Sequence, residues 1–210
     1  MIAVKICGLN APEAFDAALD AGADYLGFVF FPASPRYVTP DMAATLSRRT
    51  KGGPPRVGLF VNPTAEMIEQ VLATAPLDAL QIYGARDRIA AFKAQFGLPV
   101  WAAVGVSTRA DLPATPLDAD RLVLEAKPPA GATRPGGNAT TFDWSILLGW
   151  RAPTPWLLAG GLTPDNVATA IRDTGAVAVD VSSGVESARG VKDPAMIHRF
   201  IAAAKAAAPA

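Results

Sequence analysis

Two segments near opposite ends of the chain carry the residue types best suited to chemistry. Lys5–Leu9 ends the first apolar run and contains Cys7, the only cysteine. A thiolate there could abstract a proton or attack carbon, and Lys5, two residues away on the same strand face, would lower its pKa. Asp180–Glu186 follows the last apolar run and offers hydroxyls and flexible backbone for a phosphate. A buried, inert thiol is the alternative interpretation of Cys7.

Glu125 is the candidate acid. It ends the apolar run Leu122–Leu124, and a carboxyl group there is costly to bury unless it faces a polar site. Partial burial would raise its pKa toward neutrality, as a general acid requires. An ion pair with Lys5 or Lys127 is the alternative, and it would lower the pKa instead.

Three further polar residues follow apolar runs and are predicted to bind substrate, namely Arg36, Gln81 and Asp180. Two prolines stiffen the loop before Arg36, so its guanidinium could be presented accurately to a planar carboxylate. A solvated surface arginine is the alternative at this loop position.

Glycines and hydroxyls follow the last two apolar runs. They are Gly160, Gly161, Ser182, Ser183 and Gly184. Glycine lets backbone N–H groups approach an anion closely, and a helix N-terminus adds positive potential. The pair of loops predicts phosphate binding.

The elements that must position these residues alternate between strand and helix along the chain. Eight candidate strands are Ile2–Ile6, Tyr25–Phe30, Arg56–Val61, Ala79–Ile82, Pro99–Ala103, Arg121–Leu124, Trp156–Leu158 and Val177–Val181. This alternation predicts one α/β domain over residues 1–210, a (β/α)8 TIM barrel. A doubly wound open sheet shares the alternation, but no Gly-x-Gly-x-x-Gly turn follows the first strand.

Helix starts and loops can be read between these strands. Asn10 is expected to cap the first helix, and Thr39, Thr64 and Thr163 are expected to open later ones. The Pro/Gly-rich stretch Pro128–Asn138 is interpreted as a long strand–helix loop that could act as a lid.

Composition excludes several classes of function. Nineteen basic and nineteen acidic residues balance, so neither nucleic acid nor an anionic membrane is an expected partner. No apolar stretch reaches the length of a membrane span, and no export signal precedes the first strand. We therefore expect a cytoplasmic protein. The sole histidine, His198, is expected on a helix surface, and without a second one no metal site is predicted.

With these segments assembled, the chain closely resembles phosphoribosylanthranilate isomerases of tryptophan biosynthesis over nearly its whole length. The motifs that carry the resemblance are Lys5–Gly8, Phe31–Arg36, Gly58–Asn62, Phe142–Trp144, Ala159–Leu162 and Asp180–Glu186. Lys-x-Cys-Gly near the start together with Asp-Val-Ser-Ser-Gly-Val-Glu near the end is highly specific.

The resemblance implies an Amadori rearrangement without a cofactor. N-(5-phosphoribosyl)anthranilate would become 1-(2-carboxyphenylamino)-1-deoxyribulose 5-phosphate, with Cys7 as the base and Glu125 as the acid. Arg36 would hold the anthranilate carboxylate, and the two glycine-containing loops would hold the phosphate. A monomer or a homodimer is expected, and the sequence does not decide between them.

Three positions depart from the family pattern. The acid is usually an aspartate where this chain has Glu125, so Asp180 is kept as a second candidate acid. Tyr83 stands where a histidine is usual, and Gly136–Ala139 replaces Gly-Gly-Thr-Gly. Two alternatives therefore stay open. One is another phosphosugar barrel enzyme, an epimerase or a lyase, and the other is a catalytically silent barrel that acts as a binding subunit.

Overall fold

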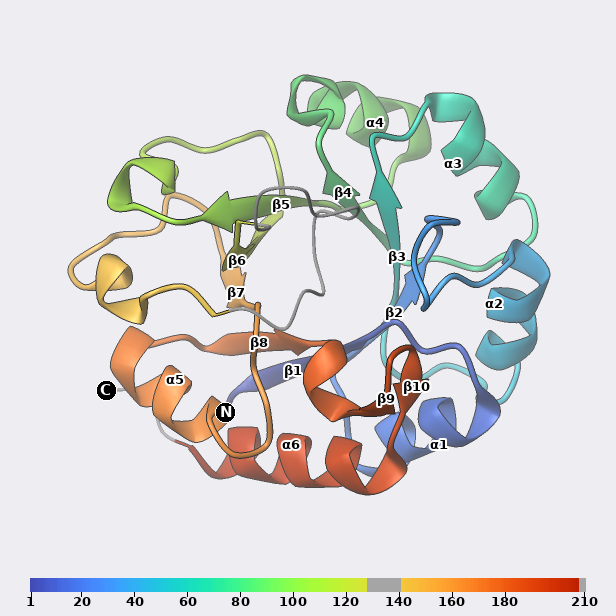
Figure 1. Ribbon diagram of the computed structural model, residues 1–210. Helices are drawn as coiled ribbons and strands as arrows, with labels where there is room; N and C mark the ends of the chain where they lie inside the picture. Colours follow the sequence, from blue (N-terminus) through green and yellow to red (C-terminus); the bar gives the residue numbers. More distant parts are fainter. Residues whose placement is uncertain (128–140, 208–210) are drawn as a thin grey trace.

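Eight parallel strands close into a barrel in the computed structural model, which describes residues 1–127 and 141–207 (Figure 1). The strands pair in sequence order, and β1 pairs with β8 to complete the ring. They are β1 (Ala3–Cys7), β2 (Tyr25–Val29), β3 (Arg56–Val61), β4 (Ala79–Tyr83), β5 (Val100–Val106), β6 (Arg121–Ala126), β7 (Trp156–Leu158) and β8 (Ala178–Val181). The predicted TIM barrel is confirmed, and the doubly wound sheet is wrong because the sheet has no open edges.

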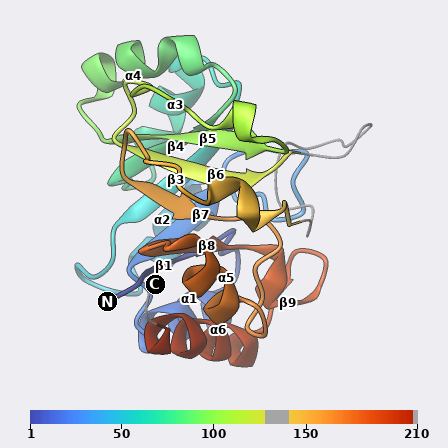
Figure 2. The same ribbon diagram turned by 90° about the vertical axis from the view of Figure 1, so that its left-hand side faces the viewer.

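Helices cover the outside of the barrel (Figures 1 and 2). The α-helices of the described residues are α1 (Pro12–Asp20), α2 (Pro40–Ser47), α3 (Ala65–Leu72), α4 (Ile89–Phe96), α5 (Val167–Thr174) and α6 (Pro194–Ala206). Short 3-10 helices are η1 (Arg86–Arg88), η2 (Arg109–Asp111), η3 (Trp144–Leu147) and η4 (Ser183–Val185). A small hairpin, β9 (Glu186–Ala188) with β10 (Val191–Lys192), follows β8 and lies beyond its carboxyl end.

Local sequence sets most of the helix starts. The side chains of Thr39 and Thr64 cap α2 and α3, as expected, and each accepts a hydrogen bond from the backbone of the first turn. Two predicted starts are wrong. Asn10 does not cap α1 and instead donates to the Gly190 carbonyl, and α5 begins at Val167 because the residues after Thr163 form a turn first.

Alternation along each strand divides its side chains between the barrel interior and the helices. Val57, Trp101 and Leu157 pack together in an apolar cluster inside the amino-terminal half of the barrel. Cys7, Leu59 and Tyr83 form a second interior cluster nearer the carboxyl ends. The interior is therefore filled by side chains, and its contents change from apolar to ionisable along the barrel axis.

Two other expectations can be placed in the fold. His198 is exposed on α6, as predicted. No helix of the described residues is long and apolar enough to cross a bilayer. The predicted Pro128–Asn138 lid and the Gly136–Ala139 departure lie outside the described residues.

Candidate active site

A pocket enclosing about 670 Å³ of empty space opens at the carboxyl ends of the strands. This is the end at which barrel enzymes place their catalytic groups. Its polar lining comes from loops and strands far apart in sequence, and the full lining is Cys7, Val29, Phe31, Ser34, Arg36, Leu59, Val61, Tyr83, Glu125, Ala159, Gly160, Gly161, Leu162, Asp180, Val181, Ser182, Ser183 and Gly184. Nine of the ten residues predicted from the sequence as site residues therefore line one pocket, and Gln81 does not.

Cys7 reaches the pocket from the last residue of β1 and is only 3 % exposed. Gly27 faces Cys7 from β2. A Cβ added at Gly27 would lie 3.1 Å from the sulfur, so a larger residue there would crowd the thiol. Burial raises the pKa of Cys7, and the Asp180 carboxylate raises it further, while Lys5 and Lys192 oppose this shift. The expected lowering by Lys5 is therefore outweighed, and without a ligand Cys7 is a neutral thiol.

Lys5 and Asp180 form a buried ion pair below the thiol, with 3.0 Å between Nζ and Oδ1. The two residues are register partners on β1 and β8, so the closure of the barrel brings them together. Desolvation lowers the pKa of Lys5, but the charges of Asp180 and Cys7 outweigh it and the net shift is upward. Lys5 thus stays charged in an interior from which water is excluded.

Glu125 emerges from β6 into the pocket and is 6 % exposed. Burial raises its pKa to about 8; hydrogen bonding from Tyr83 lowers it, Asp180 adds to the rise, and Lys5 opposes it. The alternative ion pairs do not form, because Lys5 pairs with Asp180 and Lys127 pairs with Asp111. At neutral pH the carboxyl group is protonated, which is the state that a general acid needs.

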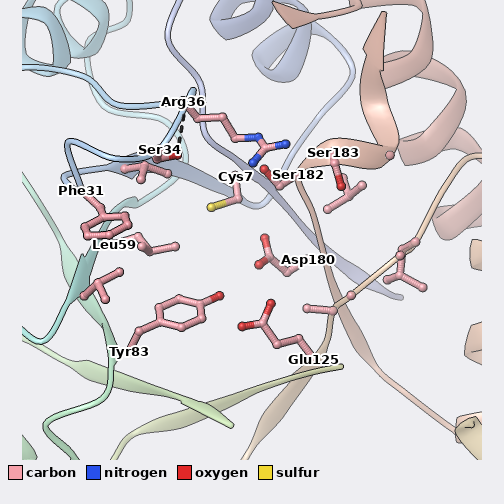
Figure 3. Close-up of a pocket in the computed structure, with 18 residues that line it drawn as sticks. Cys7, Phe31, Ser34, Arg36, Leu59, Tyr83, Glu125, Asp180, Ser182 and Ser183 are labelled. Carbon is pink, nitrogen blue, oxygen red and sulfur yellow. Dashed lines mark hydrogen bonds between the residues drawn. The ribbon is translucent and has the colours of Figure 1, made fainter. Parts of the chain in front are cut away.

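Tyr83 ends β4, and its hydroxyl points toward the Glu125 carboxyl across the pocket (Figure 3). Burial, followed by the nearby Glu125, Cys7 and Asp180, raises the pKa of Tyr83 well above its ordinary value, so it remains a neutral donor. In the same view Asp180 lies between Cys7 and Glu125. The mouth of the barrel therefore holds several ionisable groups that influence one another's protonation.

Gln81 lies beneath the pocket and not in its wall. It is fully buried one strand period below Tyr83, whose hydroxyl accepts a 3.5 Å hydrogen bond from Gln81 Nε2. The Gln81 Oε1 atom has no hydrogen-bond partner among the described residues. We therefore assign Gln81 to the support of Tyr83 and do not propose direct substrate contact for it.

Arg36 is buried at the rim and paired within the protein. Its Nε and Nη2 atoms donate to the two carboxylate oxygens of Glu186 at 2.5 and 2.9 Å. The Arg36 side chain passes close to Gly8. A Cβ at Gly8 would lie 2.7 Å from Arg36 Cδ, so a side chain at this position would obstruct the arginine. The solvated surface arginine considered from the sequence is wrong, since the side chain is only 4 % exposed.

The two loops expected to bind phosphate pack directly against each other. A Cβ on Gly184 would lie 1.7 Å from the Leu162 carbonyl oxygen, so only glycine permits this approach. Among the described residues, the amides of Gly160 and Gly161 donate to no backbone or side-chain acceptor. Both glycines line the pocket together with Ser182 and Ser183, so their unpaired N–H groups are available to an anion bound there.

Comparison with known proteins decides the family. Residues 4–203 match the family model for N-(5'-phosphoribosyl)anthranilate isomerase. A protein of that name from Acidiphilium cryptum is 56 % identical over 207 residues, which span 99 % of this chain and 100 % of the relative. One from Paracoccus denitrificans is 55 % identical over 98 % of both chains. The chain belongs to the N-(5'-phosphoribosyl)anthranilate isomerase family.

Solved structures agree with this assignment. The isomerase from Thermotoga maritima superimposes with a TM-score of 0.83 at 36 % identity, over 98 % of this chain and 99 % of that one. Another isomerase structure, in complex with reduced 1-(o-carboxyphenylamino)-1-deoxyribulose 5-phosphate, gives 0.81 at 36 % identity with the same coverage. The activity expected from the sequence, isomerisation of phosphoribosylanthranilate in tryptophan biosynthesis, is thereby confirmed.

Two residues that contact the pocket lining from outside it, Glu186 and Lys192, are not predicted by the sequence to have a role: Glu186 bonds to Arg36 and Lys192 bonds to Ser182. Both lie on the β9–β10 hairpin, where Lys192 Nζ donates to Glu186 Oε1 at 2.7 Å. The signal available was a glycine at position 190 between two opposite charges, which is common in surface turns and predicts no buried pair.

Proposed function

We propose that Cys7 and Glu125 carry out the Amadori rearrangement of N-(5-phosphoribosyl)anthranilate as base and acid. The substrate is a small phosphorylated sugar joined to anthranilate, and the product is the open-chain ketone 1-(2-carboxyphenylamino)-1-deoxyribulose 5-phosphate. The observation that carries the proposal is that one pocket collects a thiol, a protonated carboxyl group and free backbone amides from β1, β6 and the loops after β7 and β8.

The acid acts first. Protonated Glu125 gives its proton to the furanose ring oxygen, the bond between that oxygen and C1′ breaks, and the nitrogen lone pair forms a Schiff base. Burial supports this role because it keeps the proton on Glu125 up to a pH of about 8. The longer side chain of glutamate, compared with the usual aspartate, is accommodated opposite the Tyr83 hydroxyl (Figure 3).

The base acts second. The Cys7 thiolate removes the proton from C2′, and the electron pair moves into an enolamine whose nitrogen regains neutrality. The enolamine then tautomerises, with a proton leaving the enol oxygen and one added at C1′, so the atoms of substrate and product balance. Lys5 supports the thiolate electrostatically from the same strand face.

The remaining lining would hold the two anionic ends of the substrate. Gly160 and Gly161 line the pocket together with Ser182, Ser183 and Gly184, and these five residues would bind the phosphate. Arg36 would meet the anthranilate carboxylate with those N–H groups that Glu186 does not occupy. Asp180 stays a substrate-binding candidate through its place in the pocket wall, although its ion pair with Lys5 gives it a structural task as well.

Three broader expectations remain predictions. Residues 1–210 are taken as one domain, which is supported by the pairing of β1 with β8. A cytoplasmic location and a monomeric or homodimeric assembly are likewise untested. A related isomerase from Thermotoga maritima is described as dimeric.

Turnover measurements test the proposed catalytic role of Cys7. Purified protein is incubated with phosphoribosylanthranilate, and the decay of substrate fluorescence is followed for wild type, Cys7→Ala and the surface control His198→Gln. We expect wild type and control to turn over equally, and Cys7→Ala to lose about 10³-fold or more in kcat while still binding the reduced product analogue. Wild-type turnover by Cys7→Ala would show that the base is another group. A folded wild type that binds the analogue without turnover would indicate the silent barrel.

A further inference from the structure

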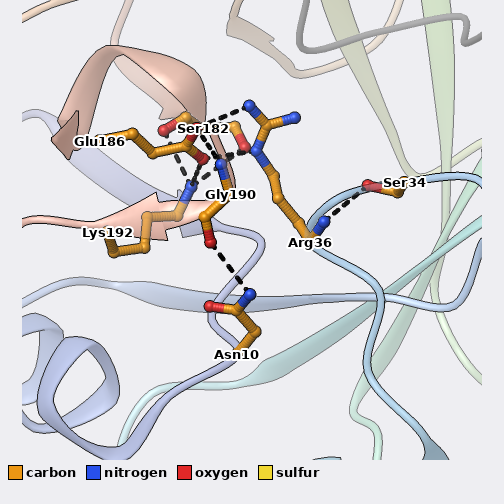
Figure 4. A network of polar contacts seen from close by, with 7 residues as sticks. All are labelled: Asn10, Ser34, Arg36, Ser182, Glu186, Gly190 and Lys192. Atoms are coloured by element: carbon orange, nitrogen blue, oxygen red, sulfur yellow. Dashed lines mark hydrogen bonds and ion pairs between the residues drawn. The ribbon is translucent and has the colours of Figure 1, made fainter. Parts of the chain in front are cut away.

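A buried network of charges connects the two anion-binding ends of the pocket. Glu186 lies at its centre, between the guanidinium of Arg36 and the ammonium of Lys192 (Figure 4). Lys192 Nζ also donates to the Ser182 carbonyl at 2.9 Å and to Ser182 Oγ at 3.3 Å. One carboxylate therefore joins the loop after β2 to the loop expected to bind phosphate.

The geometry at Arg36 shows which of its N–H groups remain free. A guanidinium presents a side edge, made by Nε and one terminal nitrogen, and an end edge, made by the two terminal nitrogens. Glu186 occupies the side edge through Nε and Nη2. Among the described residues, Nη1 donates to no protein acceptor, so the end edge is the part left to meet a ligand carboxylate at the pocket.

Backbone contacts hold the network in place. Glu186 accepts a further hydrogen bond from the Gly190 amide at 2.9 Å, and the Gly190 carbonyl accepts from Asn10 at 3.1 Å. Gly190 has a φ of +84°, and a Cβ there would lie 2.6 Å from the Pro35 carbonyl oxygen. The hairpin is thus seated against the loops after β1 and β2.

Glu186 and Lys192 both stay charged in this network, although burial acts against each charge. Burial alone would raise the pKa of Glu186, yet Arg36 and Lys192 hold it at about 2. Desolvation lowers the pKa of Lys192 to about 8 against the opposing effect of Glu186. Around neutral pH the three side chains carry one net positive charge.

We propose that Glu186 and Lys192 are positioning residues for substrate recognition. Glu186 orients Arg36 so that the end edge of the guanidinium meets the substrate carboxylate. Lys192 connects Glu186 to Ser182 and so fixes the distance between the carboxylate site and the phosphate loop. A ligand with a carboxylate at one end and a phosphate at the other is selected by this separation. The roles of Arg36 and Ser182 on which this inference rests belong to the function proposed above.

A charge-balanced double variant, Glu186→Gln with Lys192→Met, tests the proposal. It removes one negative and one positive charge, so the net charge beside the pocket is unchanged, and no buried charge of the pair is left alone. We expect KM for phosphoribosylanthranilate to rise about tenfold or more, as for one lost charge-assisted hydrogen bond. The kcat should change by less than about twofold, since neither residue touches the reacting atoms.

Two controls separate positioning from general damage. Asp16→Asn with Arg49→Met removes an exposed ion pair elsewhere, and it should leave KM and kcat unchanged. Thermal unfolding of both double variants is followed by circular dichroism. A folded Glu186→Gln/Lys192→Met variant with unchanged KM would overturn the proposal. An equal fall in kcat and kcat/KM would also overturn it, because the pair would then act on the chemical step.

Calorimetric titrations with anthranilate and with inorganic phosphate test ligand binding separately from catalysis. We expect Glu186→Gln to weaken anthranilate binding about tenfold, because Arg36 loses its orientation. If Glu186 merely competes with ligands for Arg36, this variant would bind anthranilate more tightly, and the proposal is wrong. These arms remain informative even if the wild type does not turn over phosphoribosylanthranilate, which would count against the proposed function alone.

Discussion

The two halves of the barrel interior are built on the same strands but have opposite chemistry. On β1, Ala3 lies among apolar neighbours, and Cys7, four residues later, lines the pocket. On β6, Val123 belongs to the apolar half, and Glu125, two residues later, is an acid. A shift of one strand period on β6, or of two on β1, therefore separates a residue that stabilises the fold from one that reacts.

Stability and reactivity are thus divided along the barrel axis. In the apolar half, Trp101 and Tyr25 pack edge to face, with the guanidinium of Arg121 5.7 Å from each ring. In the pocket half, Glu125 and Cys7 are held in protonation states that burial imposes. Substitutions in the two halves should therefore separate activity from stability.

The largest expected effect is that of Glu125→Gln. Loss of the acid should lower kcat/KM about 10²- to 10⁴-fold, measured by the fluorescence decay of the substrate. A decrease of less than about tenfold would assign the acid to another group, with Asp180→Asn the next variant to assay.

The same variant should gain stability at alkaline pH. The folded pKa of Glu125 is about 8 against an ordinary value of 4.5, so its ionisation costs stability as pH rises through that window. A difference of one in pKa between the folded and unfolded states corresponds to about 1.4 kcal/mol, so the advantage of glutamine should reach a few kcal/mol above pH 8. Urea unfolding on both sides of the window measures it, and an equal difference at both pH values would contradict the assignment.

Leu157→Ala tests the apolar half. Leu157 is fully buried there, and its truncation should lower the free energy of unfolding by about 2–5 kcal/mol. The kcat and KM of the folded fraction should stay at wild-type values, because no pocket group is removed. Chemical denaturation and steady-state kinetics below the melting temperature check both parts. A large change in kcat would contradict the separation of stability from activity between the two halves.

The pH profile tests the coupling of acid and base. The reactive form needs Glu125 protonated and Cys7 ionised, yet the pKa of Glu125 is about 8 and that of Cys7 is raised above its ordinary 9.0. The population of this form grows about tenfold per pH unit below 8 and peaks between the two pKa values. We expect kcat/KM to be highest above pH 8, and a maximum near neutral pH would refute these protonation states.

Tyr83→Phe should have the smallest effect. Hydrogen bonding from Tyr83 lowers the pKa of Glu125, so removal of the hydroxyl should shift the acid limb of the profile upward. We expect kcat near neutral pH to fall by less than about tenfold. The matched reference is Tyr37→Phe, at an exposed tyrosine outside the pocket. An acid limb that does not move would assign Tyr83 to packing alone.

Short-range patterns in the sequence were enough to predict the barrel and most of the site. Eight strands were placed within a few residues of their observed bounds, because apolar runs and Thr or Gly boundaries depend on local geometry. The rule that polar residues after barrel strands meet at one end then brought Cys7, Glu125 and the glycine loops together.

Contacts between distant segments could not be predicted in the same way. Whether Arg36 faces a substrate or Glu186 depends on where the hairpin after β8 lies, and Asn10 serves that hairpin and not its own helix. The sign of the Cys7 pKa shift likewise depends on burial and on Asp180, which barrel closure brings near. Residue type and spacing thus predict the chemical groups, whereas their ionisation and partners follow from three-dimensional proximity, because Coulomb and desolvation energies depend on distance and burial.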